Sequence, residues 1–133
     1  MSKFRHSSNS AVFVVLLVST AFLASGSVMA GGSSPVHQMA EILHGLMHYP
    51  DSADKARLQQ MLNNPKTSAT EGTLARAILN VMHHANAQDI DKLQSLVANK
   101  SASNNEKMLA EIVLKLDHGP NKQDKARLQA LMH

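Results

Sequence analysis

Apolar residues recur along this chain at intervals of three and four positions, the spacing that places side chains on one face of an α-helix. The pattern runs through six stretches between residues 33 and 133, and polar residues separate each stretch from the next. The apolar positions of the first, third and fifth stretches are Met39, Ile42, Leu43 and Leu46; Leu74, Ala77, Ile78 and Val81; and Leu109, Ile112, Val113 and Leu116. Those of the other stretches are Leu58, Met61 and Leu62; Leu93, Leu96 and Val97; and Leu128, Leu131 and Met132. The sequence therefore predicts an all-α domain of six amphipathic helices.

The six stretches come in pairs, because the sequence repeats itself with a period of 35 residues. With this shift His48, His83 and His118 coincide, and many other positions match without a gap. The three copies, as we call these segments, are residues 33–67, 68–102 and 103–133. A fixed period of this size is typical of stacked supersecondary units. Each copy is predicted to fold as a helical hairpin, so that three tandem hairpins form either an open solenoid or a compact helical bundle.

The ends of the predicted helices carry recognisable signals. Ser68 with Glu71, and Ser103 with Glu106, match the capping box that begins a helix. The N-cap residues predicted for the second helices of the copies are Asp51, Asn86 and Asn121. Each first helix is predicted to end near the histidine that the copies share, because a proline or a softer break follows it.

In its period and its number of helices, a two-helix unit of this length resembles tetratricopeptide-type repeats over residues 33–133. The resemblance implies helical hairpins that stack on one another. The large aromatic residues of that family are missing from the positions where they would fall. The resemblance therefore concerns architecture alone, and it transfers no binding residues to this chain.

Residues 1–30 have the composition of a secretory signal peptide. Lys3 and Arg5 precede an apolar run at residues 11–24, and small residues at 28–30 suit a cleavage site. We predict cleavage after Ala30, which gives a periplasmic or secreted domain that is not held in the membrane. The run of 14 residues is shorter than the about 20 residues of a membrane span, so an uncleaved anchor is the less favoured alternative. The chain has no cysteine, which excludes disulfides and a lipid anchor on cysteine.

Charge and aromatic content exclude further classes of function. The chain has 13 Lys and Arg residues against 10 Asp and Glu residues, and two of the basic residues lie in the predicted signal peptide. Tyr49 is the single Phe, Tyr or Trp residue after residue 30. Nucleic-acid binders use a basic face or aromatic stacking platforms, so nucleic acid is not a predicted partner. No catalytic motif or phosphate loop occurs, and we predict neither catalytic residues nor an enzyme.

Histidine is frequent after residue 30, and the period divides the histidines into two kinds. His48, His83 and His118 recur at one position, at the predicted end of the first helix of each copy. A histidine there can donate a hydrogen bond to a free carbonyl group, and it suits the negative end of the helix dipole. This structural role explains the threefold recurrence without any ligand. The histidines that do not recur are His37, His44, His84 and His133.

A candidate metal site lies on the first predicted helix. Its residues, spaced i, i+4, i+7 and i+11, are His37, Glu41, His44 and His48. We call this row the first-helix stripe, and the spacing places it opposite the apolar face. Imidazoles one turn apart can bind Zn²⁺, Cu²⁺ or Ni²⁺, and Glu41 could add a carboxylate ligand. His83 and His84 are weaker candidates, and the alternative is that the stripe is a solvated helix face.

Methionine precedes histidine at residues 47–48, 82–83 and 132–133. A thioether beside an imidazole suits Cu(I). However, adjacent residues of a helix point about 100° apart, so these pairs add little support for chelation if they are helical.

Two functions of different classes follow from these patterns. The first is a non-enzymatic module that binds another protein, because stacked hairpins form an extended groove or ridge. Its partner-facing residues would be the exposed ones that do not recur, namely His37, Glu41, His44, Tyr49 and His84. The second is a periplasmic protein that binds or buffers a metal through the first-helix stripe.

Overall fold

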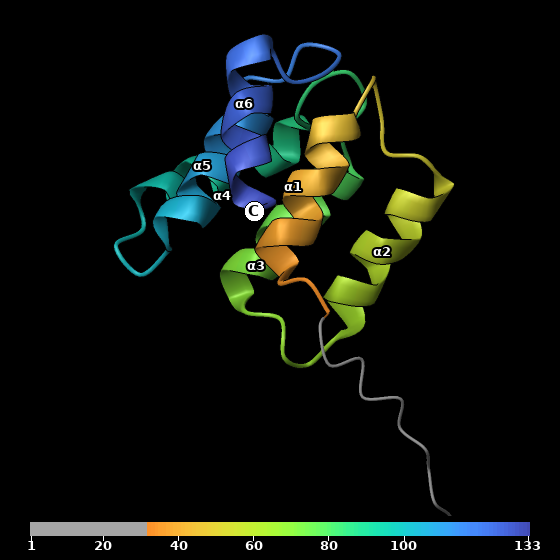
Figure 1. Ribbon diagram of the computed structural model, residues 1–133. Helices are drawn as coiled ribbons and strands as arrows, with labels where there is room; N and C mark the ends of the chain where they lie inside the picture. The colour runs from red at the N-terminus through yellow and green to blue at the C-terminus, as the bar shows by residue number, and fades with distance from the viewer. Residues whose placement is uncertain (1–31) are drawn as a thin grey trace, which may run out of the picture. The chain divides into compact units, whose positions relative to one another are not determined.

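The structure, a computed structural model, describes residues 32–133, and in that range it consists of helices joined by loops with two isolated β-bridges. The helices labelled in Figure 1 are α1 (Pro35–Gly45), α2 (Ser52–Asn63), α3 (Ala69–Leu79), α4 (Ala87–Ala98), α5 (Asn104–Leu114) and α6 (Lys122–Leu131). The predicted all-α fold of six helices is confirmed. None of these helices combines the length and the apolar character that crossing a membrane requires. The predicted signal peptide, residues 1–30, lies outside the described residues.

Polar side chains begin the helices where the sequence predicts. Ser68 and Ser103 each accept a hydrogen bond from the backbone N–H of the glutamate three residues later, and that glutamate accepts one from the backbone N–H of the serine. Both predicted capping boxes are therefore confirmed. In the first copy Ser34 accepts from the backbone N–H of His37. The N-caps of α2, α4 and α6 are Asp51, Asn86 and Asn121, as predicted.

The first helices of the three copies, α1, α3 and α5, pack against one another in the middle of the bundle. Each second helix packs mainly against the first helix of the next copy, so that α2 lies against α3 and α4 lies against α5. The last helix, α6, packs against α1 and closes the circle, as Figure 1 shows. The helices therefore form a compact bundle with approximate threefold symmetry. Of the two predicted arrangements, the chain adopts the compact bundle and not the open solenoid.

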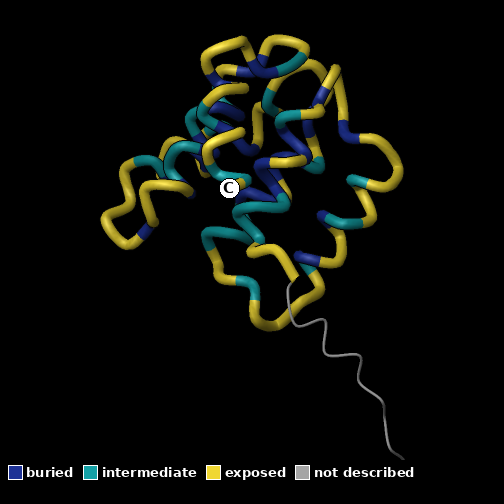
Figure 2. The backbone as a smooth tube through the Cα atoms, viewed as in Figure 1, coloured by how far each residue is buried: buried dark blue, intermediate teal, exposed yellow. Residues whose placement is uncertain are grey.

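The core contains the residues that the apolar pattern selects, and Figure 2 shows them along the inward sides of the helices. Ala40, Ala75 and Ala110 are fully buried, and their small side chains allow α1, α3 and α5 to approach closely. Large side chains that are also fully buried include Ile42, Leu43, Leu58, Leu74, Ile78, Leu93, Leu109, Ile112 and Leu128. Burying one such side chain contributes about 1.5–3 kcal/mol, so helix packing supplies most of the stability of this aromatic-poor domain.

Buried carboxylates of the bundle are hydrogen-bonded. Asn80 Nδ2 donates to Asp89 Oδ2 at 2.8 Å. The Thr70 hydroxyl donates to Glu106, which thereby links α3 to α5. Burial alone would raise the pKa of Glu106, but hydrogen bonds from Thr70 and from Ser103 together lower that pKa below its ordinary value. Glu106 is therefore held as a charged carboxylate inside the bundle.

Candidate metal site

Three loops at one end of the central helices present the recurrent histidines. The C-caps of α1, α3 and α5 are Leu46, Asn80 and Lys115, so each first helix ends before its histidine. The prediction that these histidines cap helix ends is therefore wrong. The residues two positions before the histidines, Leu46, Val81 and Leu116, are buried and draw the chain into the core, whereas the histidines themselves are exposed. The loops are therefore tethered at their base and present an imidazole at their apex.

Backbone contacts join the three loops to one another. The N–H of His83 donates to the carbonyl of His48 at 2.6 Å, and the N–H of His118 donates to the carbonyl of His83 at 2.8 Å. These bonds connect each copy to the next at the position of the histidine itself. The spacing of the three side chains is thus set by the backbone of the loops.

Residues that follow the histidines also pack across loops. His84 Nδ1 donates to the carbonyl of Leu116 at 3.0 Å. Gly119 lies so close to the first loop that an added Cβ would stand 2.7 Å from the Leu46 carbonyl oxygen. A side chain at position 119 would therefore force the first and third loops apart.

All three histidines adopt positive φ angles, 146° at His48, 69° at His83 and 66° at His118, and they are the non-glycine residues with this conformation in the described chain. The left-handed region costs a residue with a Cβ about 1–2 kcal/mol. Such strain persists where the surrounding structure enforces it, and it concentrates at functional sites. The strain shared by all three copies therefore makes this loop position a candidate functional position.

The three imidazoles converge, and we call this group the histidine triad. The ring centroids of His48 and His83 lie 5.0 Å apart, those of His48 and His118 5.3 Å, and those of His83 and His118 4.9 Å. One ring nitrogen from each lies within 4.8 Å of the others, and all three residues are exposed. Within residues 32–133 this is the group of three or more His, Cys, Asp or Glu residues whose spacing could hold a metal ion.

A carboxylate orients one member of the triad. Asp117 Oδ1 lies 2.8 Å from Nδ1 of His118. Because a carboxylate accepts, the hydrogen of this contact lies on Nδ1, and Nε2 is the ring nitrogen that a neutral imidazole would offer to a metal. Metal-binding histidines usually have such a partner on the other ring nitrogen, since it fixes the tautomer and raises the basicity of the ligand.

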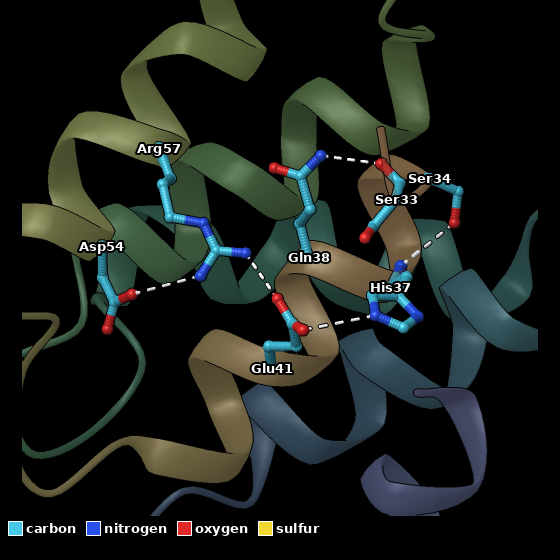
Figure 3. A network of polar contacts seen from close by, with 7 residues as sticks. All are labelled: Ser33, Ser34, His37, Gln38, Glu41, Asp54 and Arg57. Carbon is cyan, nitrogen blue, oxygen red and sulfur yellow. Dashed lines mark hydrogen bonds and ion pairs between the residues drawn. The ribbon is translucent and has the colours of Figure 1, made fainter. Parts of the chain in front are cut away.

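The predicted first-helix stripe does not form a single row, because α1 ends at Gly45 and His48 lies in the loop beyond it. Figure 3 shows that His37 does contact Glu41, with 3.3 Å between Nε2 and Oε1. Glu41 is also bound by Arg57, whose Nη2 lies 2.5 Å from Oε2. The hydrogen bond from Arg57 lowers the pKa of Glu41. A metal at this carboxylate would have to break an existing ion pair.

The sequence therefore identified part of the triad. His48 and His83 were predicted as ligands, but with other partners, and the structure brings them together with His118. His44 is half-buried on α1, and His84 is engaged with the backbone of the third loop. His118 was predicted as a structural residue alone. The signal that could have found it is the recurrence itself, once the copies are arranged around a closed bundle.

A hollow lies beside the triad. It is lined by Tyr49, Lys55, Leu79, Asn80, Val81, Met82 and Asn86 and has a volume of about 470 Å³. The ammonium group of Lys55 lies 5.5 Å from the centroid of the Tyr49 ring, within the range of a cation–π contact. Tyr49, the residue after His48, therefore lines this hollow together with Leu79, Asn80, Val81, Met82 and Asn86 of the second copy.

Comparison of the chain with protein-family models, curated proteins and solved structures finds no match.

Proposed function

We propose that this protein binds a transition-metal ion through His48, His83 and His118. The observation that carries the proposal is the convergence of three exposed imidazoles, one from each copy, at the same end of the bundle. Imidazole nitrogen is a ligand for Zn²⁺, Cu²⁺ and Ni²⁺. Three protein nitrogens with an open fourth position are a recurrent arrangement for zinc.

The spacing of the nitrogens supports this proposal. Tetrahedral coordination with Zn–N bonds of 2.0–2.1 Å requires the nitrogens to stand about 3.3 Å apart. They now lie within 4.8 Å of one another, so closure requires each pair to approach by no more than about 1.5 Å. The rings are exposed, so rotation about the side-chain torsions can supply this movement without repacking the core.

The energetics of the loops support the same proposal. The strain at the three histidines is not offset by burial of their side chains, because all three residues are exposed. A bound ion would stabilise the folded state through all three at once, because a ligand that binds only the native protein adds free energy in proportion to the logarithm of its concentration. Lowering the pH should weaken binding, because protons compete for the same nitrogens.

Calorimetric titration of the tag-free protein with Zn²⁺, Cu²⁺ and Ni²⁺ tests the proposal. We expect one ion per chain with sub-micromolar affinity for at least one of these metals. The variants His48→Ala, His83→Ala and His118→Ala should each lose at least about 10-fold in affinity, since even an outer-shell partner of a ligand is worth that much. His37→Ala and His44→Ala are the matched controls, and they should bind as the unmodified chain does. Millimolar or non-stoichiometric binding, or equal losses in the controls, would refute the triad as the site.

A protein-interaction module remains the other prediction from the sequence. Its motivation was the extended groove of an open stack, whereas α6 closes this bundle onto α1. The exposed residues near the triad, Met47, Tyr49 and Met82, would belong to such a surface. We rank it second, because no observed contact defines what would bind there.

We also propose that the site acts outside the cytoplasm, in the periplasm or after secretion. The support is the composition of residues 1–30, which is that of a signal peptide. Mass spectrometry of the exported protein should find Gly31 at the N-terminus. An intact Met1 on protein recovered from the cytoplasm would contradict this location.

A further inference from the structure

Methionines in the described chain fall into two groups. Met39 and Met61 are buried, and Met108 and Met132 pack partly buried against the same core. Met47 and Met82 are instead 74% exposed. A flexible apolar side chain ordinarily fills gaps in a core, as the first group does, so the exposed pair calls for a different explanation.

The exposed pair stands directly before two members of the triad. Met47 precedes His48 and Met82 precedes His83, and both methionines lie in the loops after α1 and α3. The helical geometry that would point adjacent side chains about 100° apart does not apply to residues outside a helix. The residue equivalent to them in the third copy is Asp117, which binds the ring of His118. Each triad histidine therefore follows a residue that offers either a thioether sulfur or an orienting carboxylate.

We infer that the ion selected by this site is Cu(I), held by the histidine triad together with the thioether of Met47, Met82 or both. The inference rests on the proposed metal-binding function. Imidazole alone serves zinc, copper and nickel alike, but thioether sulfur is a soft ligand that favours Cu(I) and adds little for Zn²⁺. Three nitrogens leave the fourth tetrahedral position open, and a thioether on a flexible, exposed side chain supplies the ligand for it.

Two affinities measured on the same variants test the inference. Cu(I) affinity is measured anaerobically, under ascorbate, by competition with a chromophoric Cu(I) chelator such as bicinchoninate. Zn²⁺ affinity is measured by calorimetry. The double variant Met47→Leu/Met82→Leu keeps the size and apolar character of the side chains and removes both sulfurs. We expect this variant to lose at least about 10-fold in Cu(I) affinity, because the substitutions remove the sulfur ligands. Its Zn²⁺ affinity should stay within about threefold, because the imidazoles remain in place.

Tyr49→Leu is the matched control, because Tyr49 is an exposed large apolar residue beside the triad that carries no sulfur. It should leave Cu(I) affinity unchanged. X-ray absorption at the copper edge should show sulfur together with nitrogen around the ion in the unmodified chain, and nitrogen without sulfur in the double variant.

The outcomes separate the two proposals. If the double variant binds Cu(I) as tightly as the unmodified chain, or if no sulfur lies near the copper, the Cu(I) inference is overturned while metal binding by the triad stands. If the unmodified chain binds neither Cu(I) nor Zn²⁺ at the triad, the proposed function itself fails. A loss of Cu(I) affinity of equal size in Tyr49→Leu would also overturn the role of the thioethers.

Discussion

Replacing His83 or His118 by glycine should leave a more stable protein than replacing the same residue by alanine. Their φ angles of 69° and 66° lie in the left-handed region. A Cβ in this region costs about 1–2 kcal/mol. Glycine avoids that cost, but its greater conformational freedom in the unfolded chain lowers the stability of the folded protein by about 0.5–1 kcal/mol relative to alanine. The net advantage of glycine over alanine should therefore be about 0.5–1 kcal/mol at each position.

Urea unfolding of the metal-free protein, followed by far-ultraviolet circular dichroism in the presence of a chelator, measures this difference. Thermal unfolding should show the glycine variants melting about 2–8 °C above the alanine variants, since 1 kcal/mol shifts the midpoint of a small domain by about 4–8 °C. Gly72 on α3 provides the opposite control, because an added Cβ there meets nothing within 4 Å. Gly72→Ala should stabilise the protein by about 0.5–1 kcal/mol, as expected for a glycine within a helix.

The reasoning would be refuted if alanine equalled or exceeded glycine at both histidine positions while Gly72→Ala behaved as expected. The same variants also separate stability from binding. Both the glycine and the alanine variants lack an imidazole, so both should lose metal affinity although they differ in stability. Loss of affinity in both variants, together with higher stability of the glycine variant, is expected where a strained residue is retained for its side chain.

Four further predictions concern the bundle around the triad. Gly119→Ala should destabilise the protein by about 1–3 kcal/mol, because its Cβ would meet the Leu46 carbonyl oxygen at 2.7 Å; a neutral effect in urea unfolding would argue against the close packing of the first and third loops. Thr70→Val should cost about 1–3 kcal/mol at neutral pH, since it removes a hydrogen bond from buried Glu106. Because the folded-state pKa of Glu106 lies below its ordinary value of 4.5, the stabilisation is present above that value and disappears as the pH falls through the folded-state pKa. The unfolding curves of the two proteins should therefore differ at neutral pH and converge at acid pH, and a cost that is independent of pH would contradict this. Leu93→Ala should cost about 2–5 kcal/mol because Leu93 is fully buried, and a loss below about 1 kcal/mol would mean that α4 packs loosely. Asn80→Ala should cost about 1–3 kcal/mol by leaving Asp89 without its amide donor, whereas Asn63→Ala, at the exposed end of α2, should be close to neutral in the same assay.

Local chemistry in the sequence was sufficient to predict the helices and their starts. The capping boxes at Ser68 and Ser103 form through contacts within three residues, so they depend on nothing distant. The apolar spacing likewise selects the buried face of each helix before any partner is known. Both features are local, and both are found in the structure.

The site depends on contacts between copies, and these are not written in any single stretch of sequence. The end of α1 at Gly45 follows from burial of Leu46 in the core, which moves His48 off the helix and breaks the first-helix stripe. The pairing of Glu41 with Arg57 joins α1 to α2 across 16 residues of sequence. Neither event could be inferred from spacing along one helix, because both require knowing what packs against it.

The recurrence of one residue type at one position acquires a different meaning once the bundle is closed. In an open stack, residues 48, 83 and 118 would lie one repeat apart along the array, and their side chains would not meet. In this bundle α1, α3 and α5 surround a common centre, so a position just beyond the end of each is brought to the same place three times. Three equivalent loops then converge on one point, as the subunits of a symmetric trimer do at their axis. A single residue type, repeated with the period of the chain, is therefore enough to bring three imidazoles together, and helix capping is not needed to explain why histidine recurs.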